Sequence, residues 1–164
     1  MVRIGNQYVS SIGGQVGWTT LSDGRFKEDI SENVPGLAFI GQLRPVTYRL
    51  NRQALNDYTG ITARREKIRA ENPDAVFLTG EQYSPVTTGF IAQEVEQAAR
   101  NVGFDFSGVD TPENENDLYG LRYAEFVVPL VKAVQEQQQQ IEELQAKVTE
   151  LESKLYEQES KNGK

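Results

Sequence analysis

Ser22 and Lys27 are the residues of this chain whose types and spacing could do covalent chemistry. The sequence contains no histidine and no cysteine. That composition excludes a Ser-His-Asp triad, a Cys-His pair and any zinc site built from those two residue types. A lysine that loses its proton in a desolvated site can still act as a base toward a hydroxyl. Ser/Lys chemistry is therefore the main route to covalent catalysis left open.

The spacing of Ser22 and Lys27 requires a turn between them. In an extended segment, at about 3.3 Å per residue, they would stand more than about 10 Å apart, and in a straight helix they would face different directions. Asp23 and Gly24 must therefore fold the chain back, and a glycine without a Cβ suits that position. Ser-Asp-Gly is equally typical of an ordinary turn, which is the favoured interpretation of these residues taken alone.

The clearest element that could position such a site is a C-terminal helix with a heptad pattern. Positions a are Val127, Val134, Ile141, Val148 and Leu155, and positions d are Leu130, Gln137, Leu144, Leu151 and Gln158. Roughly 30 residues of helix would extend about 45 Å and leave this apolar seam in water, so self-association is a physical requirement. Mostly β-branched residues at a with leucine at d favour two strands on general rules.

Shorter elements are expected between these two regions. The pattern predicts a short helix over 37–43, a strand over 46–50, a helix over 63–70, a strand over 75–78 and a helix over 89–98. We expect the helix over 89–98 to pack against the strand over 46–50. The largely polar residues 51–80 are interpreted as an insertion. Residues 2–21 alternate brief apolar pieces with glycine, which predicts short strands that need a larger β structure or other copies as partners.

Charge and composition exclude several classes of partner. With 24 acidic and 17 basic residues the net charge is -7, which argues against nucleic-acid binding. The one basic run is interleaved with glutamates, and the acidic region over 105–117 does not follow the EF-hand spacing, so both are interpreted as solvated surfaces. We expect no metal and no cofactor. We also expect no membrane partner, because no secretory or membrane-spanning apolar run is present. We also expect the chain to be part of a longer protein.

Four segments, in one order, resemble a known family. Ser22-Asp23-x-Arg25-x-Lys27, followed by Ile30, resembles the opening of the C-terminal intramolecular chaperone auto-processing domain, a self-cleaving peptidase domain of phage tail spikes, endosialidases and tail fibres, also found in myelin regulatory factor. The other three segments are Leu43–Tyr48, Gly89–Glu96 and Tyr123–Glu136. Together they cover the chain from Ser22 almost to its end.

The resemblance implies that the chain cuts its own Leu21–Ser22 bond, with Ser22 as nucleophile and Lys27 as general base. Either Ser22 attacks the Leu21 carbonyl and water releases the ester, or Lys27 activates a water directly. Lys27 must be neutral to accept a proton, through burial or through the positive charge of Arg25. Asp23 would oppose that effect, so we assign it to turn geometry or to orienting Arg25.

Gln93, Glu94 and Glu96 lie in the matched central segment. Gln93 could donate a hydrogen bond to the developing oxyanion, and the glutamates could orient the base. The alternative is that all three form an exposed helix face.

The predicted fold is α+β, in three parts. Residues 1–21 would be the β end of a fibre shaft, 22–122 the globular auto-processing core, and 123–164 the coiled-coil helix. The resemblance implies a homotrimer acting on the upstream shaft of the same chain, in the cytoplasm of a bacterial host during assembly of a virion tail or phage-like particle. A non-cleaving trimerisation or attachment module at a fibre tip is the alternative, and cleavage within one chain or between neighbours stays open.

Overall fold

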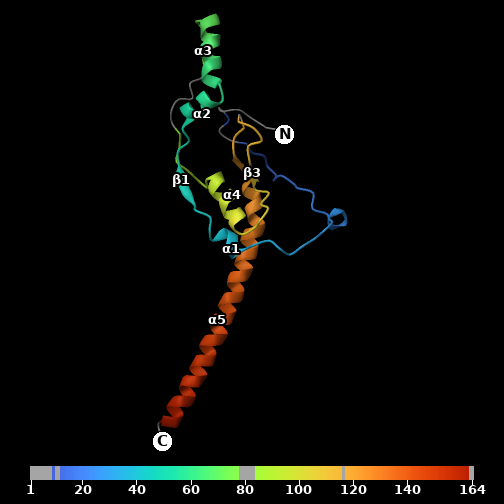
Figure 1. The fold of residues 1–164 in the computed structure, drawn as a ribbon, viewed down its shortest axis with the longest axis vertical. Coiled ribbons are helices and arrows are strands. Elements are labelled where there is room, and N and C mark those ends of the chain that lie inside the picture. The colour runs from blue at the N-terminus through green and yellow to red at the C-terminus, as the bar shows by residue number, and fades with distance from the viewer. Residues whose placement is uncertain (1–8, 10–11, 78–83, 116, 163–164) are drawn as a thin grey trace. The chain divides into compact units, whose positions relative to one another are not determined.

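The computed structural model describes residues 9, 12–77, 84–115 and 117–162, in an α+β fold (Figure 1). The chain divides into two compact units. The first consists of Met1–Glu32 and Arg49–Val86, and the second of Asn33–Tyr48 and Thr87–Lys164. The expected boundaries at 21/22 and 122/123 stay predictions, because the units follow contacts within the chain rather than function.

In the first unit, the described residues form one 3-10 turn and two helices. The turn, η1, spans Gly24–Phe26, and the helices α2 and α3 span Arg52–Tyr58 and Ile61–Glu71. The helix predicted over 63–70 is therefore confirmed, and it ends at Asn72, directly before a proline. No residue of α2 or α3 is buried.

One predicted β segment of the first unit is wrong where the structure describes it, and the other, which was expected to form only with β partners from outside the segment, stays a prediction. Residues 75–77 form no strand, and Leu78 lies outside the described residues. Residues 12–21 are exposed and likewise form no strand, and most of 1–11 lies outside the description. A strand needs a hydrogen-bonded neighbour, and an isolated segment of this length cannot supply one for itself.

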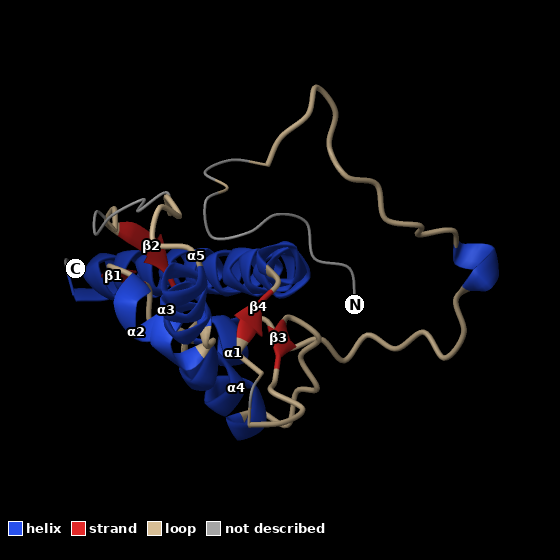
Figure 2. Cartoon of the chain, turned by 90° about the horizontal axis from the view of Figure 1, so that it is seen from above, coloured by secondary structure: helices blue, strands red, loops and turns tan. Residues whose placement is uncertain are grey.

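The described residues of the second unit form two small antiparallel sheets (Figure 2). Strand β1 (Val46–Tyr48) pairs with β2 (Thr87–Gly89), and β3 (Val109–Asp110) pairs with β4 (Gly120–Leu121). The prediction placed Gly89 in a helix and extended β1 to residue 50; both were wrong. Gly89 belongs to a strand because it pairs with Val46 of β1, and a Cβ at this position would collide with the Tyr123 hydroxyl, so the strand requires glycine here.

The core of the second unit is a cluster of aromatic and small residues. Helix α1 (Leu37–Ile40) contributes Phe39, and helix α4 (Ala92–Asn101) contributes its one buried face. The buried members are Phe39, Val95, Ala98, Ala99, Phe106 and Phe126. Ring centroids lie 4.9 Å apart both for the Phe39–Phe106 pair and for the Phe106–Phe126 pair, in tilted and edge-to-face arrangements. The buried face of α4 therefore packs in this aromatic cluster. The sequence pattern had predicted that this helix packs against the strand over 46–50.

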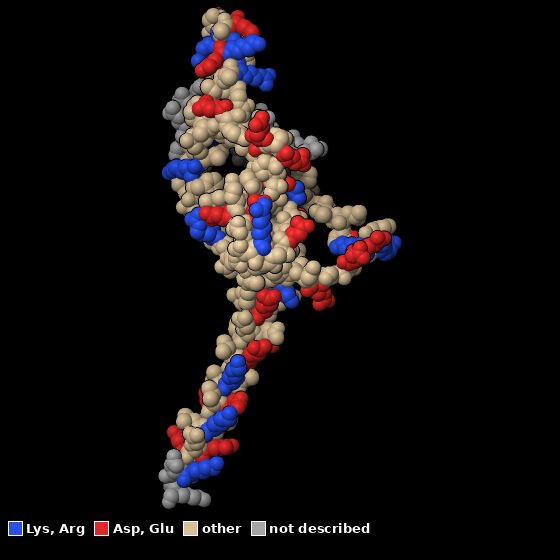
Figure 3. All heavy atoms as spheres, in the orientation of Figure 1, with Lys and Arg blue, Asp and Glu red and all other residues tan. Residues whose placement is uncertain are grey.

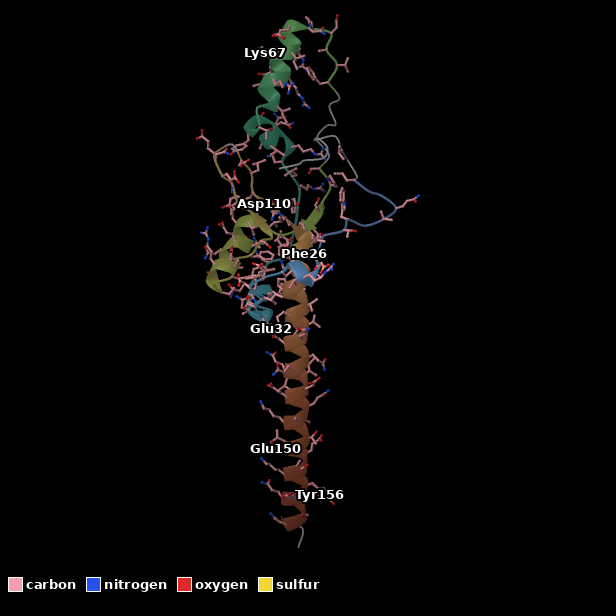
Figure 4. The ribbon with its side chains drawn as sticks, turned by 90° about the vertical axis from the view of Figure 1, so that its right-hand side faces the viewer. Phe26, Glu32, Lys67, Asp110, Glu150 and Tyr156 are labelled. Carbon is pink, nitrogen blue, oxygen red and sulfur yellow. The ribbon has the colours of Figure 1, made fainter. Side chains whose placement is uncertain are left out.

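The predicted C-terminal helix is confirmed as α5 (Val127–Asn162), which follows the 3-10 turn η2 (Tyr123–Phe126). Pro129 and Ala133 are buried against the core, and every residue from 137 to 161 is exposed. Charged residues of both signs alternate along this outer part (Figure 3), where Glu150 and Tyr156 project from the helix (Figure 4). None of the helices in the described ranges is long and apolar enough to cross a bilayer.

The heptad seam of α5 has no covering within this chain. Its apolar members keep between 46% and 64% of their surface exposed; they are Val127, Leu130, Val134, Ile141, Leu144, Val148, Leu151 and Leu155. The coiled coil and the trimer remain predictions. The exposed seam is the physical reason to expect a second copy of the helix.

Candidate active site

The motif residues form the turn that the sequence requires. Asp23 precedes η1, and its Oδ1 accepts a hydrogen bond of 3.0 Å from the Arg25 amide. The Phe26 amide donates to the Asp23 carbonyl at 3.1 Å, and the Lys27 amide donates to the Gly24 carbonyl at 3.2 Å. These short-range bonds reverse the chain between Ser22 and Lys27.

The conformational freedom of Gly24 is not what folds this turn, contrary to the expectation from the sequence. The glycines with positive φ among the described residues are Gly60 and Gly103, so Gly24 does not use a backbone conformation reserved for glycine. A Cβ at Gly24 would meet no atom within 4 Å. The cap from Asp23, rather than freedom at Gly24, explains why the segment folds back here.

The turn brings the proposed nucleophile and base together. Lys27 Nζ lies 2.8 Å from Ser22 Oγ, within the range at which a proton can pass between them. As an ammonium, Lys27 donates this hydrogen bond; as a neutral amine, it would accept the hydroxyl proton across the same contact. The geometry thus meets the first requirement of a Ser/Lys dyad, namely direct contact between the two groups.

Asp23 and Arg25 form an ion pair beside this contact. The Arg25 Nε lies 3.1 Å from each Asp23 oxygen, and a terminal guanidinium nitrogen lies 2.6 Å from Oδ2. The side-chain bond from Arg25, followed by the bond from its amide, lowers the pKa of Asp23, and the same pairing raises the pKa of Arg25. Asp23 therefore offsets the charge of Arg25, which weakens Arg25 as a means of keeping Lys27 neutral.

Burial within the described part of one chain does not supply the desolvated surroundings that a neutral Lys27 requires either. Ser22 and Lys27 are both exposed, and Phe26, labelled on η1 in Figure 4, keeps 73% of its surface in contact with water. Leu21 is 81% exposed, so the residues on both sides of the predicted scissile bond are accessible. The single chain provides the geometry of the dyad without the desolvation that an uncharged lysine requires.

The predicted supporting residues of the central segment lie on α4, and their supporting role stays a prediction. Gln93 is exposed on the first turn of α4 in the second unit, and its role at the oxyanion stays a prediction. Glu94 forms an ion pair with Arg44, whose Nε lies 3.1 Å from Glu94 Oε2. This carboxylate raises the pKa of Arg44 through the side-chain hydrogen bond and then through its charge.

Glu96 also has structural partners within the second unit. It accepts a 3.0 Å hydrogen bond from the Tyr119 hydroxyl and pairs with Arg100 one turn along α4. The hydrogen bond to Glu96 is the main cause of a raised pKa at Tyr119. Both glutamates thus tie α4 to its surroundings. Sequence spacing gave no signal for Arg44 or Tyr119 as partners, because they lie far from the glutamates along the chain.

The acidic region does not assemble a cation site in the part of the chain that the structure describes. No group of three or more Asp and Glu residues there is placed to hold a metal ion. Asp110 instead pairs with Arg122 across the β3–β4 sheet.

Comparison with known proteins supports the resemblance seen in the motifs. The family model described as chaperone of endosialidase, peptidase family S74, matches residues 22–104, which is half of the chain. The match starts at Ser22, the residue predicted to follow the scissile bond, and ends before α5. No curated protein and no solved structure matched the chain. The chain belongs to the chaperone-of-endosialidase family, peptidase family S74.

Proposed function

We propose that this chain is an intramolecular chaperone that trimerises through α5, aids the folding of a phage-type tail fibre or spike joined ahead of Ser22, and then cuts itself free at Leu21–Ser22. The observation that carries the proposal is the 2.8 Å contact between Lys27 Nζ and Ser22 Oγ at the first residues of the family match. No cofactor is required. The parent protein would assemble in the cytoplasm of a bacterial host.

The proposed reaction uses only these side chains, the scissile bond and one water. Neutral Lys27 takes the hydroxyl proton of Ser22 as Oγ attacks the carbonyl carbon of Leu21. The C–N bond breaks, the proton on Lys27 passes to the leaving amine of Ser22, and the Leu21 acyl group is left as an ester on Oγ. Water then hydrolyses the ester and gives a Leu21 carboxylate and a restored Ser22 hydroxyl.

Neighbouring copies would supply the desolvation that the single chain lacks. The apolar seam of α5 is exposed along its length, and large apolar side chains on either side of the turn are exposed as well: Trp18, Leu21 and Ile30. Covering these groups in an oligomer would remove water from the dyad and favour the neutral lysine. Cleavage would then follow assembly.

Assembly followed by cleavage is the order of events that suits a chaperone that acts only once. A helix seam that holds three chains in register reduces the entropic cost of non-local β pairing in the shaft. Once the chaperone leaves, it no longer holds the shaft, and the folding of the shaft becomes kinetically hard to reverse.

A non-cleaving trimerisation or attachment module is the second candidate. The observations that favour it are the exposure of Ser22 and Lys27 and the pairing of Arg25 with Asp23, since neither arrangement favours a neutral lysine. The two functions differ at one bond, because an attachment tip must stay joined to its shaft.

Intact mass under denaturing conditions tests the proposal. The wild-type chain, Ser22→Ala and Lys27→Ala would be expressed in parallel, with their folding and oligomeric state measured under native conditions. We expect wild type to yield two fragments that meet at Leu21–Ser22 and both variants to stay full length. Full-length wild type that is folded and oligomeric would contradict self-cleavage and favour the attachment module.

A further inference from the structure

Helix α1 and helix α5 meet at an unusually close contact that the proposed reaction does not use. The Leu37 amide, in the first turn of α1, donates a 2.7 Å hydrogen bond to Glu136 Oε2 on α5. A Cβ on Gly36 would lie only 2.6 Å from both the Ala133 amide nitrogen and that same carboxylate oxygen. The backbone of residue 36 therefore touches the backbone of α5, which only glycine permits. We call this contact, made by Gly36, Leu37, Ala133 and Glu136, the α1–α5 clasp.

Glu136 marks the point where α5 leaves the core. Ala133 is 4% exposed and Glu136 is half-buried, whereas all residues from 137 to 161 are exposed. The clasp thus joins the core to the start of the free part of the heptad seam. The family match ends at residue 104, so Glu136 belongs to a part of the chain that the match does not cover.

The clasp also ends the segment that leads from the dyad. Residues 28–35 connect Lys27 to Gly36, and they contain neither helix nor strand. Residues 28–33 are exposed. Directly after Gly36, Phe39 inserts into the core with no exposed surface. Along the chain, the clasp is the first place after the motif where the backbone is fixed to another element by a hydrogen bond and close packing.

We propose that Glu136 is a positioning residue for self-cleavage, and that the clasp passes the register of the assembled α5 helices to the segment that carries Ser22 and Lys27. This inference rests on the proposed function. Without the carboxylate, the Leu37 amide loses its partner and α1 is held on α5 less firmly. The dyad contact would still form in its local turn, but the segment would occupy the desolvated position for a smaller fraction of the time.

Four variants of the full chain separate this role from a general effect on folding. Glu136→Ala removes the acceptor, Glu136→Asp keeps the charge but shortens the reach, and Glu136→Gln keeps the reach without the charge. Glu143→Ala is the matched control, because Glu143 occupies the same heptad position one repeat later, where it is exposed and accepts a bond from Gln139 on its own helix.

The readout is the first-order rate of cleavage during cell-free synthesis, followed by intact mass after denaturation. Native mass and helix content are measured on the same samples, and hydrogen exchange is followed at the Leu37 amide. We expect cleavage to slow about tenfold in Glu136→Ala and Glu136→Asp, to stay within about threefold of wild type in Glu136→Gln, and to be unchanged in Glu143→Ala. Exchange at Leu37 should quicken only in the two slow variants, with the oligomer intact.

Two results would overturn the inference. The first is a cleavage rate equal to that of wild type in folded oligomers of Glu136→Ala and Glu136→Asp. The other is slow cleavage that appears only where the oligomer or helix content is lost, which would make the clasp merely structural. Uncut wild type would instead contradict the proposed function and, with it, the reaction that Glu136 is proposed to position. If Glu136→Ala fails to fold, the comparison of Glu136→Asp with Glu136→Gln still decides the question.

Discussion

The turn at residues 22–27 and the aromatic core of the second unit are held in opposite ways. All the hydrogen bonds that shape the turn join residues no more than five apart, and the turn is exposed. The core depends on contacts between distant segments, such as Leu37 with Glu136, which are 99 residues apart. The difference teaches that the geometry of the dyad is local, whereas the surroundings it needs must come from elsewhere.

The largest expected effect comes from changing the heptad seam of α5, which is the proposed source of the surroundings that the dyad needs. Leu144→Lys with Leu151→Lys would place charges at two d positions that a coiled coil buries, and we expect association to weaken by at least about a hundredfold. Cleavage should be lost with it, because the turn alone does not exclude water. Native mass and intact mass measure the two effects.

The matched control for the seam adds the same charges elsewhere. Ala146→Lys with Ser153→Lys places two lysines at f positions on the outer face of the same helix, and both oligomer and cleavage should survive. A monomeric seam variant that still cuts itself would show that the local turn is sufficient, and the comparison would fail.

A pair of phenylalanines gives the next largest contrast. Phe39 has no exposed surface, so Phe39→Ala should destabilise the folded state by about 3–5 kcal/mol through lost packing and a cavity. Phe26 is 73% exposed, so Phe26→Ala should change the unfolding free energy by less than about 0.5 kcal/mol. Urea unfolding measures both, with the Ser22→Ala background keeping the chains full length. Equal losses would mean that η1 is packed in the folded protein, against its description as a local turn.

The smallest expected effect is the pH response of the cap on η1. The pKa of Asp23 lies below its ordinary value of 3.8, because of hydrogen bonds from the Arg25 side chain and then from the Arg25 amide. A lowered folded-state pKa means that the cap stabilises the turn fully above pH 3.8 and is lost as the pH falls through the lower value. The amide resonance of Arg25 should therefore titrate with a midpoint below 3.8.

Asp23→Asn is the control for this titration, because an amide can still cap the turn but does not ionise in this range. Its Arg25 amide should show no midpoint. A wild-type midpoint at or above 3.8 would mean that the carboxylate is not engaged by Arg25 in solution.

The elements that could be predicted from the sequence are those with local causes. The heptad run predicts α5, Asn72-Pro73 predicts the end of α3, and the Ser22–Lys27 spacing predicts a turn. Each depends on periodicity or on backbone chemistry within a few residues. The turn was predicted for partly the wrong reason, since the Asp23 cap rather than Gly24 holds it.

The features that sequence patterns missed are those set by distant partners. The pairing of β1 with β2 makes Gly89 a strand residue against Tyr123, and the aromatic cluster sets the buried face of α4. Arg44 and Glu94 lie 50 residues apart, so no spacing rule links them. Residues 12–21 have strand-like composition but no partner among the described residues, and composition alone cannot provide one.

Mixed oligomers test most directly the claim that each chain forms its own dyad. Ser22→Ala and Lys27→Ala chains, distinguished by mass tags, would be co-expressed and isolated as mixed assemblies, with wild type as the positive control. Because Lys27 lies 2.8 Å from Ser22 within one chain, we expect both variant chains to stay full length. A Lys27→Ala chain cut at Leu21–Ser22 in the mixture would mean that a neighbour's lysine serves as the base, and would contradict the local dyad.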